Sequence, residues 1–265
     1  MNKEDAKVVS AVKKQLRSIA KGAELIQKCL SKDGRIFLFG AGTSGRLGVL
    51  EAAECPPTFG TPPELIQAVI AGGKNSIFAA REGAEDLPID SEVKKILTPK
   101  DVVIGIAASG LTPFTRSALQ FARKRGCRTI FLTCNFQEAR KPLADIIIAL
   151  NVGPEIIAGS TRLKAGTATK MALNMLTTIS MIGLGKTYGP WMVDLRPNSR
   201  KLKLRAVRIV SEITKTPPHI SEDFLNKAHG NAKLAILMSQ KKMNLAQARQ
   251  KLAKAQGFLR RALLD

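Results

Sequence analysis

The fold is decided by the stretch Gly40-Ala-Gly-Thr-Ser-Gly-Arg-Leu-Gly48, which directly follows the apolar run Ile36–Phe39. An apolar run that ends in glycines and continues into helix-forming residues predicts a buried strand, a tight turn and a helix. Glycine lets the backbone pass close to a ligand, and the free N–H groups that open the helix attract an anion. We therefore expect Gly42, Thr43 and Ser44 to bind a phosphate.

This turn is not a P-loop, which would continue into Gly-Lys-Ser/Thr, and its glycines alone do not identify the ligand. A carboxylate, Glu54, follows on the same predicted helix, which we expect Pro56 and Pro57 to end. From the residues alone, Glu54 is either a catalytic group beside the phosphate or a solvated glutamate at a helix end.

The order of strand and helix recurs along the chain. A helical stripe over residues 3–30 comes first, and a long apolar helix over residues 165–183 comes last. The predicted strands are Ile36–Phe39, Leu65–Ile70, Asp101–Ile106, Arg128–Thr133 and Asp145–Leu150. Five strands alternating with helices predict an α/β fold, a doubly wound parallel sheet with helices on both faces.

A second hydroxyl-bearing turn follows the strand Asp101–Ile106. Ser109, Gly110 and Thr112 precede Pro113, which suits the first turn of a helix. Helix capping is the commoner role of such serines and threonines. However, the carboxyl ends of neighbouring parallel strands share one crevice, so two such turns indicate a common ligand site.

Two further polar clusters stand out. Three acidic residues lie close together in this basic protein: Glu82, Glu85 and Asp86. They form either a functional group or a solvated surface patch. Before the last apolar helix, the polar residues predict another anion site, with a capped helix start as the alternative. These residues are Ser160, Thr161, Arg162 and Lys164.

Composition bounds the class of protein. The chain has 265 residues, of which 45% are hydrophobic, enough for a substantial core. No apolar run approaches the roughly 20 residues of a membrane span, and the polar start is unlike a signal peptide, so we expect a cytoplasmic protein. Four cysteines without metal-site spacing and only two histidines indicate buried reduced thiols and no bound metal.

The net charge is +21, and residues 201–265 hold 14 Lys/Arg against 4 Asp/Glu. Such a field attracts nucleic acid or anionic metabolites. Because the chain has one Trp and one Tyr for base stacking, we expect an anionic metabolite and no dedicated nucleic-acid binding. The change in composition predicts a main domain over residues 1–200 and a basic helical region over 201–265, with a small UBA-like bundle from about residue 218.

Several motifs together resemble the N-acetylmuramic acid 6-phosphate etherases, in the right order over nearly the whole chain. The resemblance rests on the first glycine stretch with Glu54-Cys-Pro-Pro-Thr58, on Glu82-Gly-Ala-Glu-Asp86, on Ile106-Ala-Ala-Ser-Gly110, and on Gly153-Pro-Glu155 with Gly159-Ser-Thr-Arg162. It extends to Asn174-Met-Leu-Thr177 and Met192-Val-Asp194. This implies a sugar-isomerase (SIS) fold, a homodimer with active sites near the subunit interface, and no cofactor.

The resemblance also implies an activity. The etherases cleave the D-lactyl ether of their substrate in cell-wall amino-sugar recycling, giving N-acetylglucosamine 6-phosphate and D-lactate. In them the glutamate at the place of Glu54 is taken as the acid, and that at Glu85 as the base. The hydroxyl turns would hold the 6-phosphate, and Arg46, Arg162 or Lys164 would meet the phosphate or the lactyl carboxylate.

This sequence departs from the etherase pattern at a few positions. Pro190 and Ser199 stand where the family often has asparagine, Leu111 replaces a polar residue, and Glu51 replaces an aspartate. Two other functions use the same fold: a sugar-phosphate isomerase, and a non-catalytic sugar-phosphate sensor. An isomerase needs no acid at a C3 ether and a sensor needs no proton-transfer pair, so both glutamates favour the etherase.

Overall fold

The computed structural model describes residues 1–264, which form two compact units. The first unit contains residues 1–53 and 63–180, and the second contains residues 54–62 and those from Met181 onward. The division at Ser180 precedes the boundary after residue 200 that the sequence suggested, because Val193 and Leu195 are buried in the core of the second unit. The two-domain description from the sequence stays a proposal, and each unit is described here by itself.

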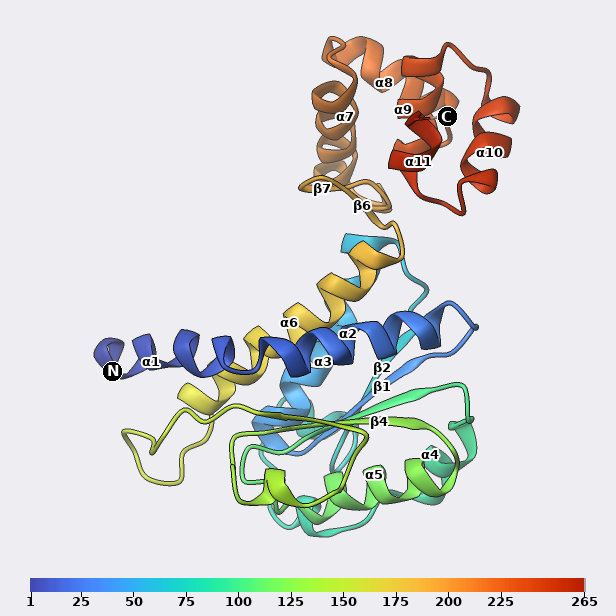
Figure 1. The fold of residues 1–265 in the computed structure, drawn as a ribbon. Coiled ribbons are helices and arrows are strands. Elements are labelled where there is room, and N and C mark those ends of the chain that lie inside the picture. The colour runs from blue at the N-terminus through green and yellow to red at the C-terminus, as the bar shows by residue number, and fades with distance from the viewer. Residues whose placement is uncertain (265) are drawn as a thin grey trace. The chain divides into compact units, whose positions relative to one another are not determined.

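A five-stranded parallel sheet forms the centre of the first unit (Figure 1). Its strands run in the order β2-β1-β3-β4-β5, and all four neighbouring pairs are parallel. The strands are β1 (Ile36–Gly40), β2 (Ile66–Ile70), β3 (Val102–Ile106), β4 (Arg128–Thr133) and β5 (Ile146–Ala149). The predicted α/β sheet is therefore confirmed, with strand bounds within a residue or so of the sequence pattern.

Helices cover both faces of this sheet. On one face, Phe37, Phe39, Val103 and Phe131 form a buried cluster with Leu119 and other side chains of α5. On the other, Gly22 of α2 lies against Ile130, Ile148 and Leu176, the last from α6. The helices that begin in this unit are α1 (Asn2–Lys13), α2 (Leu16–Leu30), α3 (Gly42–Phe59), α4 (Ser91–Ile96), α5 (Pro113–Lys124) and α6 (Lys164–Gly183).

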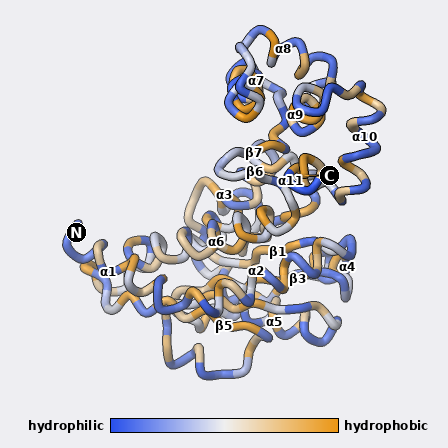
Figure 2. Tube along the Cα trace, turned by 45° about the horizontal axis from the view of Figure 1, so that its top comes forward, coloured by the Kyte–Doolittle hydropathy of each residue, from blue (hydrophilic) through white to orange (hydrophobic). Residues whose placement is uncertain are grey.

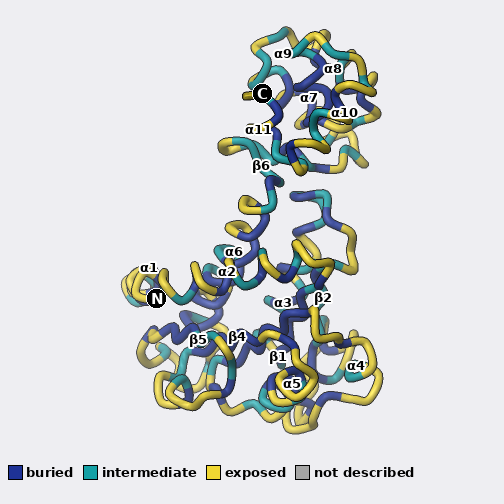
Figure 3. The backbone as a smooth tube through the Cα atoms, turned by 45° about the vertical axis from the view of Figure 1, so that its right-hand side comes forward, coloured by how far each residue is buried: buried dark blue, intermediate teal, exposed yellow. Residues whose placement is uncertain are grey.

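Burial follows directly from this layering. The central strands β1 and β3 are buried at every residue, as expected for parallel strands between two layers of helices. Both appear as apolar segments in Figure 2, and β1 appears as a buried segment in Figure 3. The apolar runs in the sequence therefore correspond to the interior of the sheet.

The first helical stripe is two helices, so the expectation of one helix over residues 3–30 is wrong. Gln15 separates α1 from α2 and has a non-helical conformation, with φ −105° and ψ 6°. Its side-chain oxygen accepts a hydrogen bond from the backbone N–H of Ala149, at 3.3 Å. The break between α1 and α2 coincides with this contact to the end of β5. The apolar periodicity of the sequence continues across the break and therefore does not predict it.

Helix α3 continues through both prolines, so the expectation that they end it is also wrong. Pro56 and Pro57 lie inside the helix, which extends to Phe59. The last turn is closed by hydrogen bonds from residues beyond the prolines: the Thr58 hydroxyl donates to the Glu54 carbonyl at 2.8 Å, and Gly60 N–H donates to the Pro56 carbonyl at 3.0 Å. Glu54 therefore lies within the helix and not at its end.

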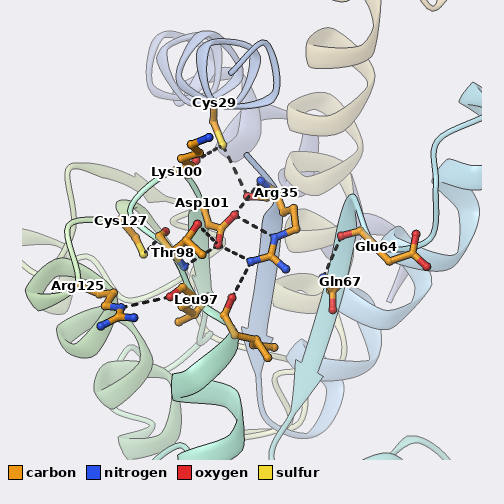
Figure 4. Close-up of polar contacts among 11 residues, drawn as sticks. Cys29, Arg35, Glu64, Gln67, Leu97, Thr98, Lys100, Asp101, Arg125 and Cys127 are labelled. Atoms are coloured by element: carbon orange, nitrogen blue, oxygen red, sulfur yellow. Dashed lines mark hydrogen bonds and ion pairs between the residues drawn. The ribbon is translucent and has the colours of Figure 1, made fainter. Parts of the chain in front are cut away.

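A buried carboxylate joins β1 and β3 at the amino-terminal edge of the sheet (Figure 4). Asp101 is 1% exposed and accepts hydrogen bonds from the backbone N–H and the guanidinium of Arg35, and from the N–H and hydroxyl of Thr98. Burial alone would raise the pKa of Asp101, but the bonds from Arg35 and Thr98 outweigh it and lower that pKa below its ordinary value. The carboxylate is therefore charged whenever the protein is folded near neutral pH.

Replacing Asp101 with asparagine is expected to lower the free energy of unfolding by about 2–3 kcal/mol at pH 7, because several charge-assisted hydrogen bonds are lost. The folded-state pKa is depressed, so this stabilisation is present above the unfolded pKa and is lost as pH falls through the folded pKa. Urea unfolding of both proteins at pH 7 and below pH 4 measures it. A difference between them that grows toward acid pH would contradict the assignment.

Besides the ends of α3 and α6, the described part of the second unit contains a short hairpin and five helices. The hairpin pairs β6 (Thr187–Tyr188) with β7 (Trp191–Met192), and the sequence pattern did not reveal it. The helices are α7 (Arg200–Thr214), α8 (Pro218–Lys227), α9 (Ala232–Lys241), α10 (Leu245–Lys254) and α11 (Leu259–Leu264). Helix α9 is central to their core, since its residues from Ala232 to Met238 are all buried.

A buried lysine stabilises this second unit. Lys233 of α9 donates to the Asp194 carboxylate at 2.7 Å and to the Gly257 carbonyl at 2.9 Å, and Lys186 reaches the same carboxylate at 3.1 Å. Burial lowers the pKa of Lys233, and Asp194 acts in the opposite direction. Asp194, which belongs to one of the etherase-like motifs, therefore connects the segment after the hairpin to α9.

Within residues 1–264, none of the helices has the length and apolar character needed to cross a bilayer. Cys29, Cys55 and Cys127 are buried, whereas Cys134 is only partly buried, which corrects the expectation that all four are buried. Burial raises the pKa of the Cys29 and Cys127 thiols to about 11. These two are protonated at neutral pH and belong to the packing of the sheet.

Candidate active site at the carboxyl edge of the sheet

The first glycine turn brings the backbone of β1 very close to the start of α3. A Cβ atom on Gly40 would lie 2.7 Å from the Gly45 nitrogen, and Gly42 has φ +51°, which favours glycine. Gly45 N–H is bonded to the Ala41 carbonyl, whereas the N–H groups at the first positions of a helix have no carbonyl one turn before them. Gly42, Thr43 and Ser44 therefore form the opening of α3, as the sequence predicts.

The second turn, after β3, is held by a chain of polar contacts. Gly110 has φ +74°, and its carbonyl accepts from Arg116 at 3.1 Å. The Arg116 guanidinium forms an ion pair with the Glu138 carboxylate at 2.8 Å. Hydrogen bonds from Lys141 and Arg116 lower the pKa of Glu138. The Ser109 carbonyl accepts from the Asn135 side chain at 2.8 Å. The loop after β4 thus fixes the turn after β3.

Thr112 is the N-cap residue of α5, but its side chain makes no capping hydrogen bond. Its hydroxyl is consequently not used in the role that such residues most often have. Ser109 is exposed, and its hydroxyl accepts a local bond from the Leu111 N–H, at 3.2 Å. Both side chains are placed where a ligand could meet them.

The two turns lie next to each other. In the register of the sheet, Gly40 of β1 pairs with Ile106 of β3, so the residues that follow these strands leave the sheet at the same edge. The strand order reverses direction between β1 and β3, and such a switch point opens a crevice outside the carboxyl ends of the strands. This confirms the geometric basis on which the sequence pattern joined the two turns.

The predicted anion-binding cluster Ser160, Thr161, Arg162 and Lys164 precedes or begins α6, and the start of this helix lies close to the first glycine turn. A Cβ atom on Gly166 would lie 3.6 Å both from the Thr161 carbonyl oxygen and from Cγ2 of Thr43. Ser160 is partly buried, and Thr161 and Arg162 are exposed. The segment containing these three residues therefore lies beside the glycine turn of α3.

Glu155 occupies the start of α6. Its carboxylate accepts from the backbone N–H groups of Lys164 and Ala165, at 3.1 and 2.9 Å. Two N–H groups at the predicted anion site are thus already hydrogen-bonded to the protein's own carboxylate. The sequence signal for this capping is Glu155 itself, an acidic residue nine positions before the helix, in the Gly153-Pro-Glu155 motif.

Lys164 is buried and bound to α1. It is 1% exposed, and its ammonium lies 2.6 Å from the Glu4 carboxylate. Hydrogen bonds from Lys164 and Lys7 lower the pKa of Glu4 to about 2. In this structure Lys164 therefore connects α6 to α1, and among the two cations of its segment Arg162 is the exposed one.

Glu85 lies in the short 3-10 turn η2 (Ala84–Asp86) and lines a cavity of about 270 Å³. The same cavity is lined by Ala41 and Gly42 from the first glycine turn, by Arg46, and by Ser76. The hydroxyl of Ser76 is buried without a hydrogen-bond partner. The structure thus brings Glu85 to the predicted phosphate turn, although the two are far apart in the sequence.

Glu54 is exposed on the part of α3 that belongs to the second unit, whereas Glu85 belongs to the first. Glu51, one turn earlier on α3, is 6% exposed and accepts hydrogen bonds from Asn174, at 2.9 Å, and from Thr177. The etherase-like motif that contains Asn174 and Thr177 therefore joins α6 to α3. Within residues 1–264, no cluster of three or more His, Cys, Asp or Glu side chains could hold a metal ion.

Two family models match overlapping stretches of the chain. Residues 18–123 match the glucokinase regulatory protein N-terminal SIS domain, and residues 75–179 match the SIS domain. Similar full-length proteins are more specific. An N-acetylmuramic acid 6-phosphate etherase of Geobacillus thermodenitrificans is 47% identical over 99% of this chain and 90% of its own length. The chain belongs to the N-acetylmuramic acid 6-phosphate etherase family.

Other etherases agree with this assignment. A second etherase of Vibrio cholerae is 49% identical over 99% of this chain and 87% of its own, and one from Clostridium beijerinckii is 48% identical over the whole chain and 88% of its own. Among solved structures, a protein described as a phosphosugar isomerase from Clostridium difficile 630 covers 91% of this chain and 66% of its own, with a TM-score of 0.51 and 14% identity. That likeness supports the SIS fold alone.

Proposed function

We propose that this etherase uses Glu85 as a general base and Glu54 as a general acid on a sugar phosphate held at the two hydroxyl-bearing turns. As a member of the etherase family, the protein is a carbon–oxygen lyase that acts on an amino-sugar phosphate, N-acetylmuramic acid 6-phosphate. The roles of individual residues are our proposal. The observation that carries them is the cavity that Glu85 shares with Gly42.

The chemistry explains why two proton-transfer groups are needed. An unactivated ether resists water, but opening of the sugar ring makes C1 an aldehyde and the C2 proton acidic. Glu85 would remove that proton while Glu54 donates one to the C3 ether oxygen, so that the C3–O bond breaks and D-lactate leaves. Water then adds to the double bond between C2 and C3 and gives N-acetylglucosamine 6-phosphate. Atoms balance without an oxidant or reductant.

The phosphate is assigned to neutral donors. Thr43 and Ser44 supply hydroxyls and helix-opening N–H groups, and Ser109 and Thr112 supply hydroxyls across the switch point. Gly42 and Gly110 allow the backbone to approach, each with a positive φ. Ser160 and Thr161 flank the same turn, and Arg162 is the exposed cation there that could meet an anionic group of the ligand.

The proposal also includes a homodimer and a cytoplasmic location. The dimer, with active sites near the subunit interface, is implied by the family resemblance. Both stay predictions.

A direct assay tests the activity. Incubating the purified protein with N-acetylmuramic acid 6-phosphate is expected to release D-lactate and N-acetylglucosamine 6-phosphate in equal amounts, because one elimination yields both. An enzymatic D-lactate assay and mass spectrometry measure the products. An aldose–ketose isomerase would give an isomer of a sugar phosphate and no lactate, and a sensor would bind without turnover; either result would contradict the proposal.

A further inference from the structure

Arg46 is the residue that connects the phosphate-binding helix to the segment with the proposed base. It lies one turn after Gly42 on α3, and its side chain lines the same cavity as Glu85. We define the acidic loop as residues 72–86, which contain the 3-10 turns η1 (Lys74–Ile77) and η2. From the sequence, Arg46 was a candidate for binding the phosphate or the lactyl carboxylate.

The guanidinium of Arg46 is engaged with the acidic loop. Its Nε donates to the Ile77 carbonyl at 2.9 Å, and its Nη2 donates to the Ala79 carbonyl at 3.1 Å. These two nitrogens form the side of the guanidinium that grips a carboxylate or phosphate with two parallel bonds. In this structure that side of the guanidinium is bonded to backbone carbonyls of the acidic loop. An anion could bind there only by displacing the loop.

The acidic loop depends on such contacts because little of it is buried. Phe78 is 92% exposed, and all the residues from Phe78 to Gly83 are exposed. Ser76 and Ala84 are its buried residues after Gly72, and Arg81 adds a bond within the loop, to the Gly72 carbonyl at 3.0 Å. Segments with few buried apolar contacts are low in local stability, so two bonds from a helix have a large influence on position.

We propose that Arg46 is a positioning residue, which fixes the acidic loop on α3 and thereby holds Glu85 at the distance from the phosphate that proton abstraction at C2 requires. This inference rests on the proposed function, because it assigns Arg46 a task only if Glu85 is the base. It differs from an anion-binding role in what it predicts. Positioning affects the chemical step, whereas a lost contact to the phosphate or to lactate weakens binding.

The test compares Arg46→Lys with Arg123→Lys. Lysine keeps the charge at position 46 but lacks the fork that spans two carbonyls. Arg123 is the matched control, since it also donates to a backbone carbonyl, that of Pro142 at 2.5 Å, and lies outside the cavity. For both variants we would measure kcat and KM of D-lactate release, and the rate at which the C2 hydrogen of the substrate exchanges in heavy water.

Arg46→Lys is expected to lower kcat and C2 exchange together, by roughly 100-fold for a displacement of about 1 Å, with KM changed less than about threefold. Arg123→Lys is expected to stay within about twofold of wild type in both constants. Hydrogen–deuterium exchange of the backbone should rise in residues 74–86 of Arg46→Lys only, while the thermal midpoints show that both variants are folded.

Three results would overturn the inference: a rise in KM of about tenfold or more with unchanged kcat, which indicates an anion-binding arginine; unchanged kinetics; or unchanged backbone exchange in the acidic loop. Failure of the proposed function gives a different result, because the wild-type protein would then release no D-lactate at all. In that case the backbone exchange of Arg46→Lys still decides whether Arg46 holds the acidic loop.

Discussion

Glu85→Gln is expected to lower kcat for D-lactate release by about 10²–10⁴-fold, the usual contribution of a general base. Glutamine has nearly the same shape and can occupy the same cavity, but it cannot accept the C2 proton. Exchange of the C2 hydrogen with heavy water should fall by the same factor, because abstraction at C2 is the step that Glu85 would perform. A coupled assay for D-lactate and proton NMR of the substrate measure the two rates.

Asp86→Asn is the matched control for this variant. Asp86 is the next residue of η2, is also exposed, and is not among the residues that line the cavity of Glu85. We expect this variant to retain activity within about twofold, as surface substitutions generally do. If Glu85→Gln retained wild-type turnover, or if Asp86→Asn lost as much, the base would have to be another group.

Glu54→Gln is expected to lower D-lactate release by a comparable 10²–10⁴-fold and to leave C2 exchange largely intact. The reason is that an acid at the C3 ether oxygen serves the departure of lactate and not the removal of the C2 proton. The two glutamates should therefore be separated by the exchange experiment even though both variants fail to release lactate. The same two assays measure this.

The control for Glu54→Gln is Glu64→Gln, which alters an exposed glutamate outside the cavity of Glu85. Wild-type lactate release by Glu54→Gln would remove the acid assignment. Loss of C2 exchange in the same variant would instead show that Glu54 is needed for deprotonation, or that both protons move in one concerted step. Exchange retained together with lost elimination is the pattern that supports distinct acid and base roles.

Some elements of this protein follow from local sequence and others do not. The strands were found because an apolar run between two layers of helices has no polar face, and Gly42 and Gly110 were found because tight turns need positive φ. Helix α3 ran past Pro56 and Pro57 because later residues supply hydrogen bonds. The break at Gln15 coincides with its contact to Ala149, which is distant in the chain.

The candidate site divides in the same way. Hydroxyls and glycines after β1 and β3 are readable because strand order places the ends of parallel strands together. The interaction partners of the charged residues could not be predicted from the sequence. Lys164 looked like a ligand-binding cation, but it is paired with Glu4 from the other end of the unit. Arg46 looked the same, but its guanidinium is bonded to two carbonyls of the acidic loop.

The sequence by itself determined the parallel sheet, the two glycine turns after β1 and β3 and, through its motifs, the family, because these depend on periodicity, backbone conformation and residue identity along the chain. Only the tertiary structure decided which charges are already paired and that Glu85 shares a cavity with Gly42. Electrostatic and hydrogen-bonding interactions depend on the distance between groups in space. Residues that are far apart in the sequence give no local signal that they will be in contact in the folded chain.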